Sequence, residues 1–357
     1  MEFRYTSLPM SVSFGAGSVA GLANVLDAHG ISRAIVLTTP EQEELGRRIM
    51  DSLGDRAVGL YPKARMHVPT DVADDAIRQA RELGADACVA VGGGSTIGLG
   101  KAIALRSDLP IIAVPTTYAG SEMTPVWGLT SDGAKKTGRD RRVLPTAVVY
   151  DPELTLTLPL KPSLESGVNA IAHAVEALYA PDASPIISLM AEEAIRALRI
   201  ALPALRADLG DLEAREHALY GSWLAGACLG ATTMGLHHKI CHVLGGTLDL
   251  PHASTHAVLL PHVFAFNAEA APGAARAVAR ALDVDVDDAA KGLASFVTSL
   301  GVTSSLRELG VQESEIGFAP AAVVETLYSN PRPVTEADVE TIIHAALQGA
   351  LPLGVTR

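Results

Sequence analysis

The spacing of apolar residues divides the chain into two parts of different character. In the first 150 residues, short apolar runs rich in β-branched side chains alternate with amphipathic helical patterns. Apolar runs of this length are typical of strands that a parallel sheet buries on both faces. The pattern predicts strands at Ala34–Thr38, Ala87–Val91, Ile111–Val114 and Ala147–Tyr150, with intervening helices such as Glu41–Leu53 and Val72–Leu83.

From Ser163 onward, the strand pattern is almost absent. Stretches rich in Ala and Leu, with apolar residues three and four positions apart, follow one another between Gly and Pro residues. This spacing predicts helices over 163–180, 185–208, 211–236, 267–282, 286–300, 320–328 and 335–349. We therefore expect residues 1–157 to form an α/β domain with a Rossmann-like parallel sheet, and residues 158–357 to form an all-α domain.

Composition supports two domains and excludes several classes of protein. The chain has 357 residues, of which 48% are hydrophobic and 19% charged, enough to bury a large core. Its formal net charge of −12 argues against nucleic acid or an anionic membrane as a partner. The three cysteines form no CxxC motif, so neither a disulfide framework nor a structural zinc site is expected. No signal peptide or membrane span is predicted, which favours a cytoplasmic protein.

Two glycine-rich stretches compete for the role of a phosphate-binding loop. GAGSVA at residues 15–20 matches GxGxxG/A formally, but the next predicted strand ends in Thr38-Thr39 and not in an acidic residue. A turn at the sheet edge is the alternative. GGGSTIGLGK at residues 92–101 follows a strong apolar strand and opens a helix, whose free N–H groups suit a diphosphate. A tight strand–helix turn is the alternative there, and the placement favours phosphate binding.

A third polar stretch follows the next predicted strand. PTTYAGSE at residues 115–122 places hydroxyl groups and a glycine at the carboxyl end of that strand. Ligands of open α/β sheets bind at the carboxyl ends of the strands. The stretch is therefore either a cofactor-binding loop or an ordinary polar loop.

Histidines are concentrated in one region, since six of the chain's 11 histidines fall within 26 consecutive residues. His238 and His242 are four residues apart, as are Asn169 and His173 earlier in the chain. Residues four apart share one face of a helix. These two pairs, with His252 following, predict a cavity lined by polar groups that carry the chemistry.

The glycines at 245–246 are expected to end the helix that carries the second pair, which would place His252 in a loop. A single histidine on an apolar helix is more often a core residue than a ligand, so it is the constellation that indicates function. His237, His256 and His262 are not part of these pairs, and we expect them to be structural or supporting residues.

Several long motifs occur in a fixed order along the chain. GGGSTIGLGK, PTTYAGSEMTP, GVNAIAHAVEA, GLHHKICHVLGG and PHASTHAVLLPH together resemble the iron-containing alcohol dehydrogenase family, whose fold is shared with dehydroquinate synthase. PTTYAGSEMTPVWGLT, KKTGRDRRVLP and NAIAHAVEALYAP resemble its maleylacetate reductase branch in particular.

The resemblance implies a nicotinamide cofactor and a set of site residues. The cofactor would be held at Gly92, Gly93, Gly94, Ser95, Thr96, Thr116 and Thr117. The family's divalent metal is bound by one Asp and three His, and these positions fall on Asn169, His173, His238 and His252. A further family histidine close to the nicotinamide matches His242.

The sequence departs from the family's metal-binding pattern at Asn169. With a neutral amide in place of Asp, a divalent ion would keep both of its charges in a partly buried cavity, which is costly. Three histidines can still hold zinc with water in the open position. We nevertheless expect a metal-independent enzyme. A second departure is Thr39, which stands where NAD-preferring members carry Asp, so the cofactor is expected to be NADH or NADPH.

The branch implies reduction of the conjugated C=C bond of maleylacetate, a dicarboxylate, to 3-oxoadipate during degradation of aromatic compounds. The alternative is a metal-dependent alcohol dehydrogenase or aldehyde reductase on the same scaffold. A nucleotide-binding protein without catalysis is a third interpretation. The basic segment at residues 135–142 contacts the dianion or forms a solvated loop. The family also suggests a homodimer, for which pairing of an edge strand is one route.

Overall fold

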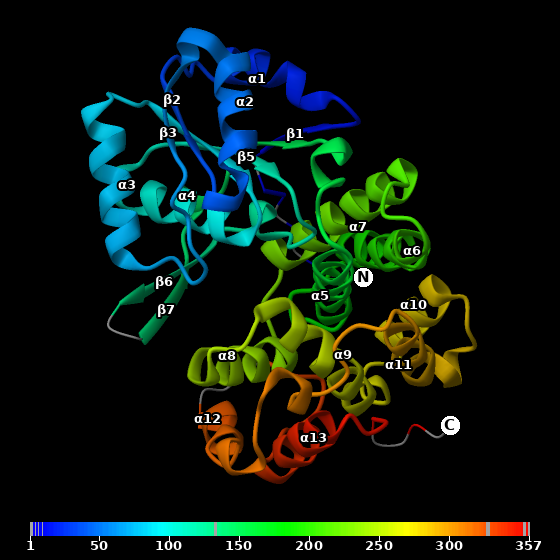
Figure 1. Ribbon diagram of the computed structural model, residues 1–357. Coiled ribbons are helices and arrows are strands. Elements are labelled where there is room, and N and C mark those ends of the chain that lie inside the picture. Colours follow the sequence, from blue (N-terminus) through cyan, green and yellow to red (C-terminus); the bar gives the residue numbers. More distant parts are fainter. Residues whose placement is uncertain are drawn as a thin grey trace. The chain divides into compact units, whose positions relative to one another are not determined.

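The computed structural model describes residues 3, 5, 7, 8, 10–131, 134–325, 329–352 and 355. The chain divides into two compact units, drawn mainly in blue to cyan and in green to red in Figure 1. One comprises Leu8–Leu158, and the other comprises Met1–Ser7 with Pro159–Arg357. Each unit has its own core and is described by itself.

A six-stranded parallel sheet with the order β1-β8-β5-β4-β2-β3 forms the centre of the α/β unit (Figure 1). The strands are β1 (Ser11–Phe14), β2 (Ala34–Leu37), β3 (Ala57–Tyr61), β4 (Ala87–Gly92), β5 (Ile111–Pro115) and β8 (Ala147–Tyr150). The four strands predicted from the sequence are all present. They are buried throughout, which explains why they read as continuous apolar runs.

Helices cover both faces of this sheet, as predicted. They are α1 (Leu22–Ala28), α2 (Glu43–Leu53), α3 (Thr70–Glu82) and α4 (Gly94–Ser107). Val36 of β2 packs in one apolar cluster with residues of α1 and α2. Its neighbour Ile35 packs in another cluster with residues of α3 and α4. The alternation of side chains along each strand therefore divides the core into two layers.

Three elements of this unit escaped the sequence pattern. The strands β1 and β3 are half-exposed along most of their length, so their apolar signal is weak. An antiparallel hairpin of β6 (Val126–Ser131) and β7 (Ala134–Arg139) lies in a polar stretch. Sequence patterns detect burial on a sheet face, and these strands have little of it.

The GAGSVA stretch forms the turn after the edge strand β1. Gly15 and Gly17 have φ angles of 145° and 73°, which side-chain-bearing residues rarely adopt. The backbone N–H groups of Gly17 and Val19 donate to the carboxylate of Asp151 at 3.1 and 3.0 Å. The structure supports the edge-turn interpretation, because the chain's own carboxylate already occupies these anion-binding N–H groups.

The other unit is helical over its described residues. Its helices are α5 (Leu160–Leu178), α6 (Pro185–Ala207), α7 (Leu212–Ala231), α8 (Leu236–Leu248), α9 (His252–Ala268), α10 (Pro272–Leu282), α11 (Ala289–Ser299), α12 (Ala319–Glu325) and α13 (Glu336–Gln348). Helix α5 is buried along nearly its whole length and contacts α6, α7 and α9. Within the described residues, no helix is long and apolar enough to cross a membrane.

Two expectations about this unit were wrong. Helix α8 continues through Gly245 and Gly246 and ends at Asp249, which has a φ of 52°. His252 is not in a loop, because it is the first residue of α9. A glycine weakens a helix by about 1 kcal/mol, which burial of a residue such as Leu244 can outweigh. The left-handed Asp249 and the following Pro251 separate the two helices instead.

Candidate functional site

The carboxyl edge of the parallel sheet carries the predicted cofactor residues. Strand β4 lies between β2 and β5, so the loops that follow these three strands emerge at the same edge. Gly93 is the N-cap of α4, whose N-terminus receives no side-chain cap from the described residues. A helix N-terminus of this kind offers N–H groups to an anion.

Gly92 and Gly93 leave no room for side chains, whereas the space around Gly94 is open. Gly92 has a φ of 152°, and a Cβ atom there would lie 2.4 Å from Oγ1 of Thr96 and 2.8 Å from Oε1 of Gln42. A Cβ on Gly93 would lie 2.8 Å from Cγ2 of Thr117. A larger residue at either position would collide with these side chains. Glycine avoids the collision and lets a ligand approach the backbone closely, as a phosphate-binding loop requires.

Hydroxyl groups surround the turn. The amide Nε2 of Gln42 donates to Oγ1 of Thr116 at 2.8 Å, and the backbone N–H of Thr116 donates to the carbonyl of Gly92 at 3.2 Å. Buried Oγ1 of Thr96 has no hydrogen-bond partner among the described residues. The structure thus brings Thr96 and Thr116 next to Gly92 and Thr117 next to Gly93, whereas Ser95 and Gly94 lie at the more exposed start of α4. Gln42 was missed, although a polar residue shortly after a buried strand is a usable signal.

Thr39 lies at the carboxyl end of β2, the strand next to β4. It precedes a short 3₁₀ helix, Pro40–Gln42. The backbone N–H of Glu41 and the hydroxyl of Thr39 lower the pKa of the Glu41 carboxyl group. A carboxylate therefore stands two residues beyond the uncharged Thr39, a feature that the sequence analysis did not consider.

Lys101 does not face solvent, and its ammonium group binds the end of the loop at residues 115–122. Its side chain is buried, and Nζ donates to the carbonyl oxygens of Ser121, Thr124 and Val126 at 2.6, 2.8 and 2.8 Å. Burial lowers the pKa of Lys101 to about 7. The ammonium group thus holds together the connection between β5 and β6.

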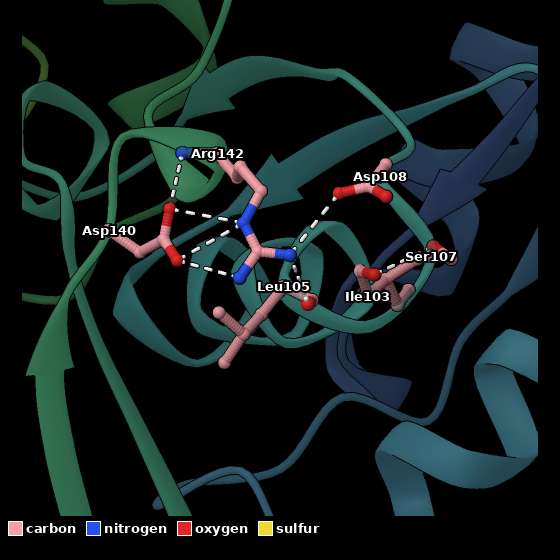
Figure 2. A network of polar contacts seen from close by, with 6 residues as sticks. All are labelled: Ile103, Leu105, Ser107, Asp108, Asp140 and Arg142. Atoms are coloured by element: carbon pink, nitrogen blue, oxygen red, sulfur yellow. Dashed lines mark hydrogen bonds and ion pairs between the residues drawn. The ribbon is translucent and has the colours of Figure 1, made fainter.

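The basic segment at residues 135–142 follows β7 into the next turn. Figure 2 shows that the guanidinium of Arg142 is already engaged: Nε and Nη2 donate to Asp140, and Nη1 donates to Asp108 and to the carbonyl of Leu105. Leu105 lies in the last turn of α4, so Arg142 interacts with the C-terminus of that helix. Arg142 therefore serves the fold of the α/β unit and is a poor candidate for binding a substrate carboxylate.

In the helical unit, three helices bring histidines together. The ring centroids of His173 (α5) and His238 (α8) are 5.2 Å apart, and those of His238 and His256 (α9) are 4.9 Å apart. These three side chains are buried, and each offers a ring nitrogen within 4.8 Å of the other two. We refer to His173, His238 and His256 as the histidine triad.

Four polar atoms of this cluster are buried without a hydrogen-bond partner in the part of the chain that the structure describes. They are Oδ1 of Asn169, Nδ1 of His173, Nε2 of His238 and Nε2 of His256. Orphaned buried polar atoms are rare in folded proteins and cost about 1–3 kcal/mol each. Their concentration at one point marks the cluster as a place where a polar ligand or water would complete the hydrogen bonding.

His256 stands at the centre of the cluster, where a supporting residue was expected. Its ring centroid lies 4.3 Å from that of His252, and its Nδ1 lies 2.9 Å from Nε2 of His237. The signal was available, because His252 and His256 are themselves four residues apart. His252 is exposed and His242 half-buried, and their rings stack with centroids 6.3 Å apart. These two form the outer side of the cluster.

Burial keeps the rings of His173 and His256 neutral. Burial, followed by the neighbouring histidines, holds the pKa of His173 and of His256 well below 6.5. Burial alone would raise the pKa of Glu176, but His238 beside it lowers that pKa to about 2. Glu176, which the sequence analysis missed, is thus an ionised carboxylate in contact with Nδ1 of His238.

The donor set can be tested against the family's divalent metal. Three imidazole nitrogens at this spacing suit zinc. The neighbouring Asn169 brings no charge, and the two oxygens of Glu176 are taken up by Nδ1 of His238 and by backbone N–H groups. Because no carboxylate of the described cluster is turned to the shared point, the charge of a divalent ion would stay uncompensated. These residues do not fit a permanently bound divalent metal well.

Comparison with known proteins extends over nearly the whole chain. Residues 9–152 match the family described as iron-containing alcohol dehydrogenase, and residues 163–347 match the C-terminal region of the same family. The maleylacetate reductase of Sphingobium indicum is 54% identical over 99% of both chains, and that of Burkholderia cepacia is 52% identical over 96% of both. The crystal structure of maleylacetate reductase from Agrobacterium tumefaciens superposes with a TM-score of 0.95, at 47% identity, over 99% of this chain and 100% of that one. The chain therefore belongs to the iron-containing alcohol dehydrogenase family, within its maleylacetate reductase branch.

Proposed function

We propose that this protein is a maleylacetate reductase, which uses NADH or NADPH to reduce the conjugated C=C bond of maleylacetate to 3-oxoadipate. Relatives of that name are 54% and 52% identical to it. The single observation that carries the proposal is the buried histidine triad beside Asn169. Its unpartnered nitrogens suit hydrogen bonding and proton transfer, and its donor set lacks the carboxylate of a metal site.

The cofactor is proposed to bind at the carboxyl edge of the sheet. Its diphosphate would lie at the start of α4, where Gly94 has open space around it. Its remaining polar groups would contact the hydroxyls of the loop that follows β5. The residues in these roles are Thr39, Gly92, Gly93, Gly94, Ser95, Thr96, Thr116 and Thr117. The closeness of Gln42 to Gly92 and Thr116 adds it to this group.

The chemistry consists of one hydride and one proton. Hydride from the nicotinamide adds to the alkene carbon that is β to the ketone, and the electron pair of the C=C bond moves to give an enolate on the ketone oxygen. The enolate carbon next to the ketone then takes up a proton. Hydrogen-bond donors near the oxygen stabilise the enolate, and a positioned side chain supplies the proton. We assign these roles to Asn169, His173, His238, His242 and His252, with His256 as an added member.

We propose further that the reaction proceeds without a metal. A simple carbonyl reduction places charge on one oxygen, where a metal ion polarises the bond. Conjugate reduction spreads the charge over the enolate, so neutral hydrogen-bond donors can stabilise it. Asn169 supports this proposal, because its amide neither compensates the charge of an ion nor repels an anionic substrate. The alternative is a metal-dependent alcohol dehydrogenase or aldehyde reductase.

The test is NADH consumption with maleylacetate, using protein treated exhaustively with chelator and checked by elemental analysis. Full activity without metal is the expected result. Activity that chelator abolishes and zinc or iron restores would refute metal independence, and activity on small alcohols or aldehydes alone would refute the substrate. Asn169→Asp is the matched variant: it adds one carboxylate to the cluster, and we expect it to bind zinc at least 10-fold more tightly than the parent protein.

A homodimer is proposed through the strand β1. This strand is at one edge of the sheet, next to β8, and none of its residues is fully buried. An accessible edge presents backbone groups that can pair with a second copy. Light scattering of the purified protein tests this, and a monomer would contradict it.

A further inference from the structure

Glu176 approaches His238 from a different helix. It lies on α5, seven residues after Asn169 and three after His173, and its side chain is 4% exposed. Its Oε1 accepts hydrogen bonds from the backbone N–H groups of His237 at 2.8 Å and His238 at 3.4 Å. Its Oε2 contacts Nδ1 of the His238 ring. One carboxylate thus binds both the backbone and the ring at the start of α8.

The start of α8 is shaped to admit this carboxylate. Its N-cap is Gly235, which has no side chain to cap the helix. A Cβ on Gly235 would lie 3.0 Å from Oε1 of Glu176 and 3.2 Å from the carbonyl oxygen of Ser329. Glu176 therefore takes the place of a local capping residue, and the absence of a side chain at Gly235 makes the close approach possible.

The contact also determines which ring nitrogen carries hydrogen. An ionised carboxylate accepts hydrogen bonds and donates none, so Nδ1 of His238 must be the N–H donor. The other nitrogen, Nε2, is buried and has no partner within the described residues. Carboxylates that fix the tautomer and orientation of a functional histidine are known from metal and catalytic sites.

We propose that Glu176 is a positioning residue for the reaction: it holds a hydrogen on Nδ1 of His238, so that every proton or hydrogen bond exchanged with a ligand passes through Nε2. The proposal rests on the proposed function for its catalytic consequence. Nε2 of the neutral ring carries no hydrogen, so it first takes up a proton from solvent and then passes that proton to the enolate carbon, while the hydrogen on Nδ1 stays with Glu176.

The first test observes the tautomer directly and needs no activity. Chelator-treated protein labelled with ¹⁵N-histidine is studied by NMR, and His238→Gln assigns the resonances. We expect Nδ1 of His238 to carry a bound proton in the wild type, and to lose it in Glu176→Gln, where the new amide NH₂ donates to Nδ1. A wild-type His238 with a bare Nδ1 would overturn the proposal, whether or not the protein reduces maleylacetate.

The second test measures the catalytic consequence. Glu176→Gln keeps an oxygen for the backbone N–H groups but reverses the donor at Nδ1, so we expect kcat with maleylacetate to fall by about 10²-fold to 10⁴-fold. The KM for NADH should stay within about twofold, since no cofactor contact changes. An unchanged kcat together with a displaced Nδ1 proton would overturn the positioning role.

Glu165→Gln is the matched control. Glu165 lies on the same helix, is 5% exposed, and accepts hydrogen bonds from Oγ of Ser254 and Oγ1 of Thr303, both at 2.6 Å. The substitution removes the same charge from a similarly buried site, whose partners are the two hydroxyl groups and, at 3.7 Å, Nζ of Lys161. We expect a small change in kcat. An equal loss of kcat in both variants would reduce the role of Glu176 to general stability of α5.

Discussion

The carboxyl edge of the sheet and the histidine triad are both polar sites, but they are built in opposite ways. The edge uses residues that are close in sequence, such as Gly92–Thr96 and Thr116–Thr117, on loops that directly follow strands. The triad collects three residues that span 83 positions, from His173 to His256, in the buried interior of a helical unit. A loop site needs correct turn residues, whereas a helix site needs correct packing.

The two sites also differ in how their polar groups are satisfied. At the edge, Gln42 binds the hydroxyl of Thr116, and Oγ1 of Thr96 is the one site hydroxyl described above as unpartnered. In the helical unit, one ring nitrogen of each triad histidine and Oδ1 of Asn169 are left without partners within the described residues. Such atoms reduce the stability of the folded state, and proteins keep them where a ligand or a reaction uses them. The helical unit therefore keeps destabilising unpartnered atoms that a reaction can use. The sheet edge instead carries glycines, so that a ligand can approach the backbone.

The largest expected effect comes from His238→Ala. If the helical unit performs the proton chemistry and the α/β unit binds the cofactor, kcat with maleylacetate should fall about 10³-fold while the Kd of NADH is unchanged. Stopped-flow turnover and NADH fluorescence titration measure the two quantities. His262→Gln, which alters a buried histidine outside the triad, is the control. An accompanying increase in the Kd of NADH would contradict the assignment of cofactor binding to the α/β unit alone.

Lys101→Met tests how much a buried charged group near the sheet edge contributes to stability. The substitution leaves the carbonyl groups of Ser121, Thr124 and Val126 without their donor, so the free energy of unfolding should fall by about 3 kcal/mol. Urea unfolding at neutral pH measures it. An unchanged or increased free energy of unfolding would mean that the cost of burying the ammonium group equals or exceeds the stabilisation from its hydrogen bonds.

Acid should destabilise the helical unit through its buried histidines. Burial lowers the pKa of His262 to about 4 from the ordinary 6.5. Between pH 6.5 and pH 4, the unfolded chain binds a proton at His262 and the folded chain does not. The free energy of unfolding therefore decreases as the pH falls through this interval. Between pH 6.5 and pH 5 this one residue should account for about 2 kcal/mol.

Urea unfolding of the wild type and of His262→Gln at several pH values measures this loss. The variant should lose less stability than the wild type over that interval. His344→Gln, which alters a half-buried histidine with a side chain 40% exposed, is the control and should follow the wild type. Equal slopes for all three proteins would show that His262 is protonated in the folded state.

The smallest effect is expected from Glu41→Gln. The carboxylate of Glu41 lies just beyond β2, where acidic residues of dinucleotide-binding folds contact the ribose hydroxyls and repel a 2′-phosphate. Its removal should raise the ratio of kcat/KM for NADPH over NADH by about 10-fold, or ~1.4 kcal/mol. Glu44→Gln makes the same charge change in the first turn of α2. If both variants shift the ratio equally, the effect is one of overall charge and not of Glu41.

Much of the α/β unit could be predicted from local sequence. The strands at 34–37, 87–92, 111–115 and 147–150 are buried on both faces, and burial on both faces is what a continuous apolar run records. The glycine turn after β4 could also be predicted, because the strand, the turn and the helix are consecutive in the sequence. The half-exposed β1 and β3 and the polar β6–β7 hairpin were not, since pairing with a neighbour leaves little trace in the residues themselves.

The helical unit shows what sequence leaves open. Spacing of four residues correctly indicated that Asn169 lies beside His173 and that His238 lies beside His242, because helix geometry fixes that distance. Which helices then face one another is decided by packing between segments far apart in the chain. The sequence therefore named the region of the cluster, while only the tertiary structure placed His256 at its centre and brought Glu176 of α5 to the ring of His238.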